Sequence, residues 1–152
     1  AIINVHSSGG REMLEAAAKA RGEFKNKSTK IIAVTVLTSL DNKDIKEIGY
    51  KDNSEDLVLR LASLAKDSGL DGVVCSAKEI SLIKNKLGKN FILVVPGIRL
   101  EEDNKNDQKR VMSPKKAIDA GADLLVIGRP ITDSKDPVKT IDNILKNIKQ
   151  WQ

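Results

Sequence analysis

A glycine followed by an arginine closes the last apolar run of the chain, in the segment Ile127-Gly128-Arg129-Pro130-Ile131. Glycine has no side chain, so backbone N–H groups beside it can approach a ligand closely. The guanidinium of an arginine offers a two-pronged donor for a phosphate group. A tight turn with a surface arginine is the alternative interpretation. Gly128 and Arg129 are therefore candidate ligands of a phosphate.

A second candidate segment, Val95-Pro96-Gly97-Ile98-Arg99, follows the preceding apolar run and leads into the irregular polar stretch 100–110. Loops at the strand ends of α/β proteins commonly hold ligands, and a long one can act as a lid. A merely solvated loop is the alternative. The segment is thus a second place where a ligand could be held.

Other polar residues stand at the ends of the first two apolar runs. Thr38 and Ser39 carry hydroxyls that can bond a base edge or a carbonyl, or cap the next turn. The segment 4–10, NVHSSGG, could form an anion-binding nest. We interpret His6 as a hydrogen-bonded structural histidine and Cys75 as a core residue.

Several motifs of known chemistry do not occur in the sequence. It has no G-x-S-x-G elbow, no G-x-x-x-x-G-K-[ST] loop and no G-x-G-x-x-G fingerprint. One histidine and one cysteine cannot build a zinc site of the usual kind. The sequence therefore predicts anion-binding groups without an obvious catalytic group.

Five short apolar, β-branched runs position these residues, and runs of this kind are typical of parallel strands buried on both faces. They are Ile2–Val5, Ile31–Val36, Gly72–Cys75, Ile92–Val95 and Leu124–Ile127. Helical segments lie between them. Their start signals are Ser54, the pair Ser76 and Glu79, Ser113-Pro114 and Asp136-Pro137. One apolar stripe runs along the last helix and consists of Val138, Ile141, Leu145 and Ile148.

The alternation of strands and helices predicts a parallel α/β sheet with right-handed crossovers. The strand starts run from residue 2 to residue 124, in four intervals that average about 30 residues, the usual size of a βαβ unit. A five-strand doubly wound sheet would be complete at this length. A (β/α)₈ barrel needs about 250 residues, so the chain would be part of one. Periodicity alone favours the complete sheet.

Composition excludes several classes of protein. The 152 residues carry a net charge of +5 with acids interleaved, and only 3% are aromatic, which argues against a nucleic-acid module and suits an anionic small ligand. No apolar run approaches the roughly 18–20 residues of a membrane span, and we expect no signal peptide. The single Cys75 suits a reducing compartment, so we expect a cytoplasmic protein.

Taken together, six segments closely resemble the bacterial orotidine 5′-phosphate decarboxylase family, in order and with its spacing over essentially the whole chain. They are NVHSSGG (4–10), AVTVLTS (33–39), GLDGVVCS (69–76), PGIR (96–99), DQKR (107–110) and VIGRPIT (126–132). The resemblance implies a (β/α)₈ TIM barrel that works as a homodimer without metal or organic cofactor. It implies conversion of orotidine 5′-phosphate to uridine 5′-phosphate and CO₂, in pyrimidine nucleotide synthesis.

The resemblance also implies roles for particular residues. Arg129 looks like the arginine that clamps the phosphate, with Gly128 as the backbone donor beside it. Gln108 resembles the glutamine that bridges phosphate and pyrimidine, and Arg99 a further contact on the phosphate side. Thr38 matches the hydroxyl residue that reads the pyrimidine edge. Pro96 matches the proline that packs near the base.

The sequence departs from the family in one respect, because the catalytic D-x-K-x-x-D motif occurs nowhere in it. In the family that motif lies at the end of the third barrel strand, shortly before the N-V-H segment. Residues 1–152 would then be the C-terminal part of a single barrel domain, strands four to eight with their helices, and we expect no catalytic residue in this chain and no decarboxylation by it alone. A related sugar-phosphate decarboxylase and a non-catalytic phosphate-binding fragment are the alternatives.

Overall fold

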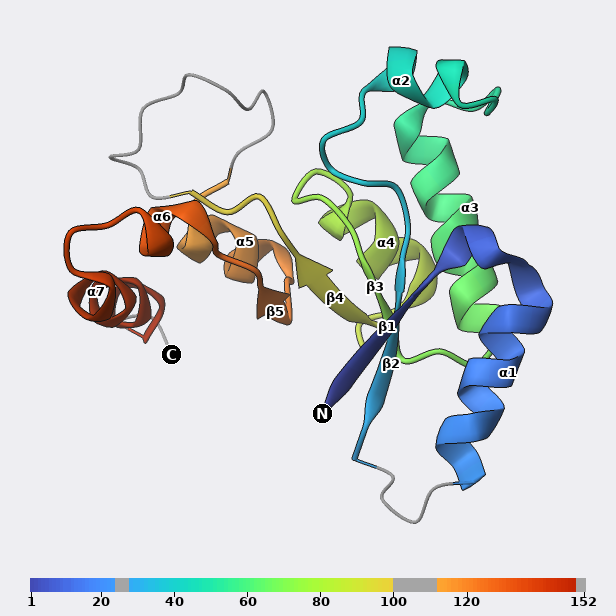
Figure 1. Cartoon of the computed structure of the whole chain (residues 1–152), viewed down its shortest axis with the longest axis horizontal. Helices are drawn as coiled ribbons and strands as arrows, with labels where there is room; N and C mark the ends of the chain where they lie inside the picture. Colours follow the sequence, from blue (N-terminus) through green and yellow to red (C-terminus); the bar gives the residue numbers. More distant parts are fainter. Residues whose placement is uncertain (24–27, 100–111, 150–152) are drawn as a thin grey trace.

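The computed structural model describes residues 1–23, 28–99 and 112–149, in which strands and helices alternate (Figure 1). The strands are β1 (Ile2–His6), β2 (Lys30–Val34), β3 (Gly72–Val74), β4 (Ile92–Val95) and β5 (Leu124–Leu125). The helices are α1 (Gly10–Glu23), α2 (Asn42–Glu47), α3 (Ser54–Asp67), α4 (Ile80–Leu87), α5 (Pro114–Ala120), α6 (Arg129–Thr132) and α7 (Pro137–Lys149), with a 3₁₀ turn, η1 (Ser7–Gly9), after β1. All five predicted strands are confirmed.

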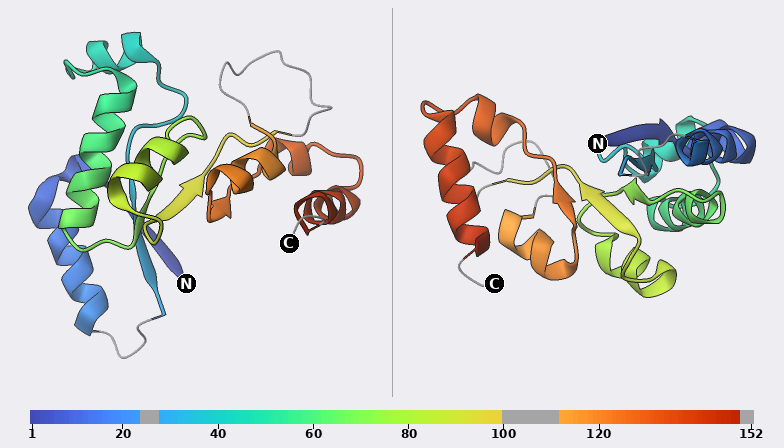
Figure 2. Two further views of the ribbon diagram at one scale, coloured as in Figure 1. Left: turned by 180° about the vertical axis from the view of Figure 1, so that it is seen from behind. Right: turned by 90° about the horizontal axis from the view of Figure 1, so that it is seen from below.

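The strands form one parallel sheet in the order β1-β2-β3-β4-β5, so every crossover moves one place in the same direction. A doubly wound sheet reverses direction at a switch point, whereas the strands of a (β/α)₈ barrel follow chain order around the axis. Helices α3, α4 and α5 follow one another along the outer side of the curved sheet (Figure 2). The order therefore confirms consecutive βα units of the barrel type and excludes the doubly wound alternative.

The core lies where the middle of the sheet meets its helices. Val73, Leu93 and Val95 on the central strands are fully buried, as are Leu14 of α1 and Ile83 of α4. These residues belong to one continuous apolar cluster, in which β-branched and leucine side chains from neighbouring strands pack against the helices.

The prediction that all five strands are buried on both faces is wrong for the two edge strands. Ile2 and Ile3 of β1 are 50% and 55% exposed, and Leu124 of β5 is 41% exposed. The reason is that β1 and β5 each have a neighbouring strand on one side only among the described residues. The two edges of the sheet thus present apolar side chains.

The predicted start signals of the helices are mostly confirmed. Ser113 caps α5 before Pro114, and Asp136 accepts a 3.0 Å hydrogen bond from the backbone N–H of Lys139 at the start of α7. Asn53, rather than Ser54, caps α3, because its side chain accepts from the backbone N–H of Asp56.

Two helices show features that the sequence did not predict. Helix α2 was not predicted; a capping box between Asp41 and Asp44 starts it. In α7 the side chain packed inward is Ile144, 4% exposed, whereas Val138 of the predicted stripe is 70% exposed. The stripe therefore faces outward over much of its length. No helix in the described part of the chain is long and apolar enough to cross a membrane.

Candidate functional site

The carboxyl ends of parallel strands meet at one edge of a sheet, and the candidate ligand residues follow β2, β4 and β5 at this edge. Loops at the carboxyl ends of barrel strands carry the active sites of enzymes with this fold. We call this side of the sheet the carboxyl edge, and the opposite side, where the strands begin, the amino edge.

Gly128 and Arg129 lie at the turn from β5 into the short helix α6. The Gly128 carbonyl accepts hydrogen bonds from the backbone N–H groups of Ile131 (2.8 Å) and Thr132 (3.1 Å). A Cβ added at Gly128 would meet no atom within 4 Å, so open space lies beside its backbone. Arg129 is exposed and forms no ion pair with a residue in the described ranges. Both residues are available to an anion.

The segment after β4 runs beside this turn, because β4 and β5 are neighbours in the sheet. Gly97 adopts a positive φ of 75°, a conformation that favours glycine, and it turns the chain directly after the half-buried Pro96. Ile98 forms an isolated parallel bridge with Met112, and the backbone N–H of Arg99 donates to the Met112 carbonyl at 3.2 Å. Arg99 is half-buried and is held at the same edge as Arg129.

Thr38 follows β2, two strands away from β4. It lies in a turn closed by a 3.0 Å hydrogen bond from the backbone N–H of Leu40 to the carbonyl of Leu37, and it is half-buried. The structure therefore places Arg99, Gly128 and Arg129 after neighbouring strands and Thr38 further along the same edge. Gln108 lies outside the described residues.

Three polar or reactive side chains near the carboxyl edge are buried. The Ser7 hydroxyl, after β1, has no hydrogen-bond partner in the described part of the chain. Glu79 accepts a 2.7 Å bond from the backbone N–H of Ser76, the contact that the capping-box pattern predicts. Cys75 is fully buried, and desolvation, with a smaller contribution from the Glu79 carboxylate, raises the pKa of its thiol to about 12. The Cys75 prediction is confirmed.

The interpretation of His6 as a hydrogen-bonded structural histidine is wrong. Its side chain is exposed, and no hydrogen bond joins it to another described residue. The segment NVHSSGG gave no signal to separate His6, the last residue of β1, from its buried neighbour Ser7, the first residue after it.

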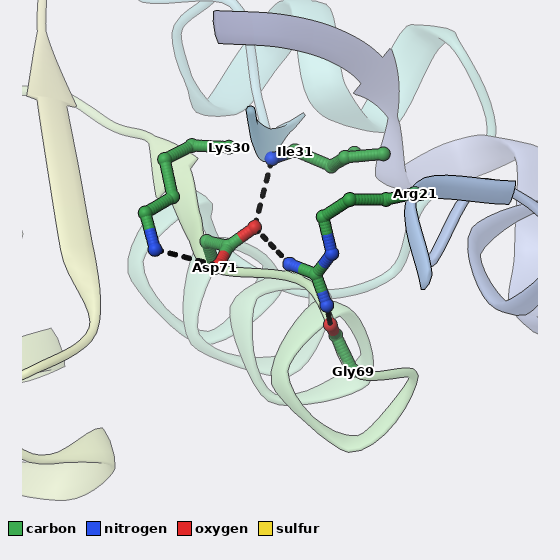
Figure 3. A network of polar contacts seen from close by, with 5 residues as sticks. All are labelled: Arg21, Lys30, Ile31, Gly69 and Asp71. Carbon is green, nitrogen blue, oxygen red and sulfur yellow. Dashed lines mark hydrogen bonds and ion pairs between the residues drawn. The ribbon is translucent and has the colours of Figure 1, made fainter. Parts of the chain in front are cut away.

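The amino edge has a different chemistry, in which charged side chains bond to one another and to the backbone (Figure 3). The Asp71 carboxylate accepts from the backbone N–H of Ile31 at 2.8 Å, pairs with Arg21 and lies 3.4 Å from the Lys30 ammonium. Arg21 also donates to the Gly69 carbonyl at 3.2 Å. Partial burial opposes the charge of Asp71, but the bond from Ile31 and the Arg21 guanidinium hold its pKa below the usual value.

The described residues contain no group of three or more histidine, cysteine or acidic side chains that could hold a metal ion. The groups that could contact a ligand are instead arginines, backbone groups and a hydroxyl, all at the carboxyl edge. This donor set suits an anion.

The fold and the carboxyl edge together define an α/β protein of the barrel type with candidate anion ligands at its strand ends. The chain belongs to the orotidine 5′-phosphate decarboxylase / HUMPS family, which it matches over residues 1–144. It is 53% identical over 149 residues to the orotidine 5′-phosphate decarboxylase of Coxiella burnetii, and 50% identical over 148 residues to that of Pseudoalteromonas translucida. Each match covers 97% of this chain and 63% of the relative.

Solved structures agree with this assignment. The crystal structure of orotidine 5′-phosphate decarboxylase from Lactobacillus acidophilus matches with a TM-score of 0.81 and 34% identity, covering 97% of this chain and 63% of that one. The crystal structure of orotidine 5′-monophosphate decarboxylase from Sulfolobus solfataricus has the same fold, with a TM-score of 0.64 and 18% identity. This match covers 98% of this chain and 61% of that one. The chain thus spans less than two thirds of the length of these relatives.

Proposed function

We propose that this chain is the C-terminal two-thirds of an orotidine 5′-phosphate decarboxylase, and that it supplies the half of the barrel that binds phosphate and pyrimidine. The observation that carries the proposal is the placement of Arg99, Gly128 and Arg129 after neighbouring strands at the carboxyl edge, in a chain 53% identical to a decarboxylase of that name. The relatives named above are orotidine 5′-phosphate decarboxylases, which favours this function over a sugar-phosphate decarboxylase.

In this proposal each candidate residue binds one part of the nucleotide. Arg129 and the backbone at Gly128 hold the phosphate, and Arg99 approaches it from the adjacent strand. Thr38 bonds the pyrimidine edge, and Pro96 packs near the base. Gln108 is assigned to the bridge between phosphate and pyrimidine on the resemblance alone.

The size of the relatives supports a barrel that needs further βα units. Because 149 residues are 63% of the Coxiella relative, about 88 of its residues lie outside the match, enough for three units of about 30 residues. Five units and three make the eight of a TIM barrel. The apolar side chains of β1 and β5, which face outward here, would then pack against the added strands.

This division separates the chemistry into two parts. Loss of CO₂ from the pyrimidine leaves a carbanion, which preorganised charge must stabilise. In our proposal the Asp/Lys array of the three further units supplies that charge and the proton. The residues of this chain bind the phosphate, a remote group whose binding energy helps to close the site and exclude water.

We further propose that the assembled enzyme is a cytoplasmic homodimer that needs no metal or organic cofactor. The resemblance supports the homodimer and the absence of a cofactor. The single, buried Cys75 is compatible with a reducing compartment.

The test uses a fusion protein, which we call the completed barrel. The residues of the Coxiella relative that lie outside the match come first, and the 152-residue chain follows them. We expect this protein to convert orotidine 5′-phosphate, followed by its ultraviolet absorbance, and the 152-residue chain alone to show no turnover above background. An inactive but folded completed barrel, or turnover by the chain alone, would contradict the proposal. A keto-sugar phosphate is the control substrate.

A further inference from the structure

Asp123 bonds both backbone groups of a single residue on the neighbouring strand. It stands directly before β5, and its N–H donates to the Leu93 carbonyl at 3.0 Å while its carboxylate accepts from the Leu93 N–H at 2.7 Å. Leu93 is fully buried in β4. A shift of β5 by one residue would break both bonds, so Asp123 fixes the register of β5 against β4.

Lys84 of α4 holds this carboxylate in place. Its ammonium lies 2.8 Å from the Asp123 carboxylate and also donates to the carbonyls of Lys89 (2.8 Å) and Phe91 (3.0 Å), so all three donors are used. The Lys84 side chain is only 12% exposed. Gly121 turns the chain between α5 and β5 with a φ of +108°, a conformation that favours glycine, and its backbone lies close to the Lys84 side chain. The contacts therefore tie helix, turn and strand together.

The strand that Asp123 fixes is short and carries the proposed phosphate ligands. β5 has two residues, and a 2.9 Å bond from the Val126 N–H to the Val95 carbonyl continues the pairing with β4 toward Gly128 and Arg129. With so few ladder bonds, the position of these ligands relative to Arg99 depends strongly on the contacts of Asp123. Misplacement of binding groups by even about 1 Å weakens their function.

We propose that Asp123, held by Lys84, is a positioning residue for phosphate binding: it sets the register that brings Gly128 and Arg129 beside Arg99. This inference rests on the proposed function, since it takes phosphate as the ligand of these residues. Asp123 lies at the amino edge and does not itself touch the ligand.

Asp71 offers a matched control. It stands directly before β3 and bonds the backbone of Ile31 in the same way, with its N–H to the carbonyl at 2.9 Å and its carboxylate to the N–H at 2.8 Å. Its cations are Arg21 and Lys30. It fixes β2 against β3, and β2 leads to Thr38 rather than to the phosphate ligands. Loss of Asp71 should therefore lower stability without weakening phosphate binding.

The experiment titrates the 152-residue chain with inorganic phosphate and follows backbone amides by NMR. We expect Asp123→Ala to raise the dissociation constant about tenfold, as for a lost hydrogen bond to a charged group, and to speed hydrogen exchange at Val126. Asp123→Asn keeps an acceptor for the Leu93 N–H and should recover most of the affinity. The dissociation constant of Asp71→Ala for phosphate should stay within about twofold of the wild-type value, because Asp71 fixes a strand that does not lead to the phosphate ligands.

If wild type and Asp123→Ala bound phosphate with equal affinity, the inference would be overturned but the proposed function would stand. The same would follow if Asp71→Ala lost as much phosphate affinity as Asp123→Ala. A folded wild-type chain that does not bind phosphate would contradict the proposed function and this inference with it. If Asp123→Ala fails to fold, Lys84→Met replaces it. This variant keeps the carboxylate without its cation and should weaken binding about threefold, so unchanged affinity would overturn the inference.

Discussion

The amino and carboxyl edges of the sheet use polar residues in opposite ways. At the amino edge Asp71 and Asp123 are tied to backbone groups and to cations within the chain. At the carboxyl edge Arg129 is exposed, with no ion pair to another described residue, and Gly128 has open space beside it. Satisfied charges stabilise a fold, whereas unpaired ones are available to a ligand. The difference indicates that the amino edge holds the strands in place, whereas the carboxyl edge presents the groups that contact a ligand.

The largest expected effect is on catalysis by the completed barrel. Arg129→Ala should lower kcat/KM about 100-fold or more, which corresponds to ~3 kcal/mol of transition-state stabilisation. The reason is that the phosphate of the substrate, desolvated in the closed site, would lose its charged partner. The matched control is Lys19→Ala, which removes an exposed cation from α1. A kcat/KM for Arg129→Ala close to that of the parent would remove Arg129 from the phosphate site.

A pair of glycines gives the sharpest comparison of the edges. A Cβ at Gly72, at the start of β3, would lie 2.1 Å from the Ile92 carbonyl oxygen, whereas one at Gly128 meets nothing within 4 Å. Gly72→Ala should therefore lower the free energy of unfolding by about 3 kcal/mol, since backbone must move. Gly128→Ala should change it by less than about 0.5 kcal/mol but weaken phosphate binding.

Urea denaturation of the 152-residue chain and its two variants measures the difference. Equal destabilisation by both substitutions would break the distinction between the edges. So would a Gly128→Ala variant that binds phosphate as the parent does.

Loss of Asp71 should lower stability by about 2 kcal/mol, because it leaves the Ile31 N–H without its acceptor. The pKa of Asp71 is lowered from the model-peptide value of 3.8. Its contribution should thus be fully present above pH 3.8 and disappear as the pH falls through its folded-state pKa, since the unfolded chain takes up the proton first. The free energy of unfolding against pH, for wild type and Asp71→Ala, measures this.

In that experiment the two curves should converge in acid. A constant gap across the acid range would show that the contribution of Asp71 does not depend on its charge. Glu15→Ala, which breaks an exposed pair with Arg11 at 3.5 Å, is the control and should shift stability by no more than about 0.5 kcal/mol.

The last prediction changes neither stability nor binding and concerns Cys75, which lies after β3. Its thiol is buried and has a pKa of about 12, so the native chain should react with a thiol reagent at pH 8 far more slowly than the urea-unfolded chain. A rate equal to that of the unfolded chain would show that the core beneath the carboxyl edge opens readily. Absorbance of the released reporter group follows the reaction.

The sequence predicts the strands well because their β-branched runs are short, continuous and separated by capping signals. It does not predict which strands lie at an edge, since exposure of Ile2 and Leu124 depends on neighbours that periodicity does not reveal. Helix α2 was missed because its six residues are too few for a periodic pattern. The apolar stripe of α7 was recognised from its spacing, but the spacing does not reveal that much of the stripe is exposed.

The same limits apply to the site. Glycine and arginine at strand ends identified the segments at the carboxyl edge from sequence. The roles of Asp71 and Asp123 could not be predicted, because an aspartate between a glycine turn and a strand is also typical of a solvated loop. Only the ladder register shows that each carboxylate meets a backbone N–H of the adjacent strand.

The most direct test of the central claim is a titration of the 152-residue chain with uridine 5′-phosphate, followed through its backbone amide resonances. We predict saturable shifts at Gly97, Gly128 and Arg129 on the carboxyl edge, and none at Asp71 and Asp123 on the amino edge. Shifts centred on the amino edge, or no saturable shift in a folded chain, would contradict the account.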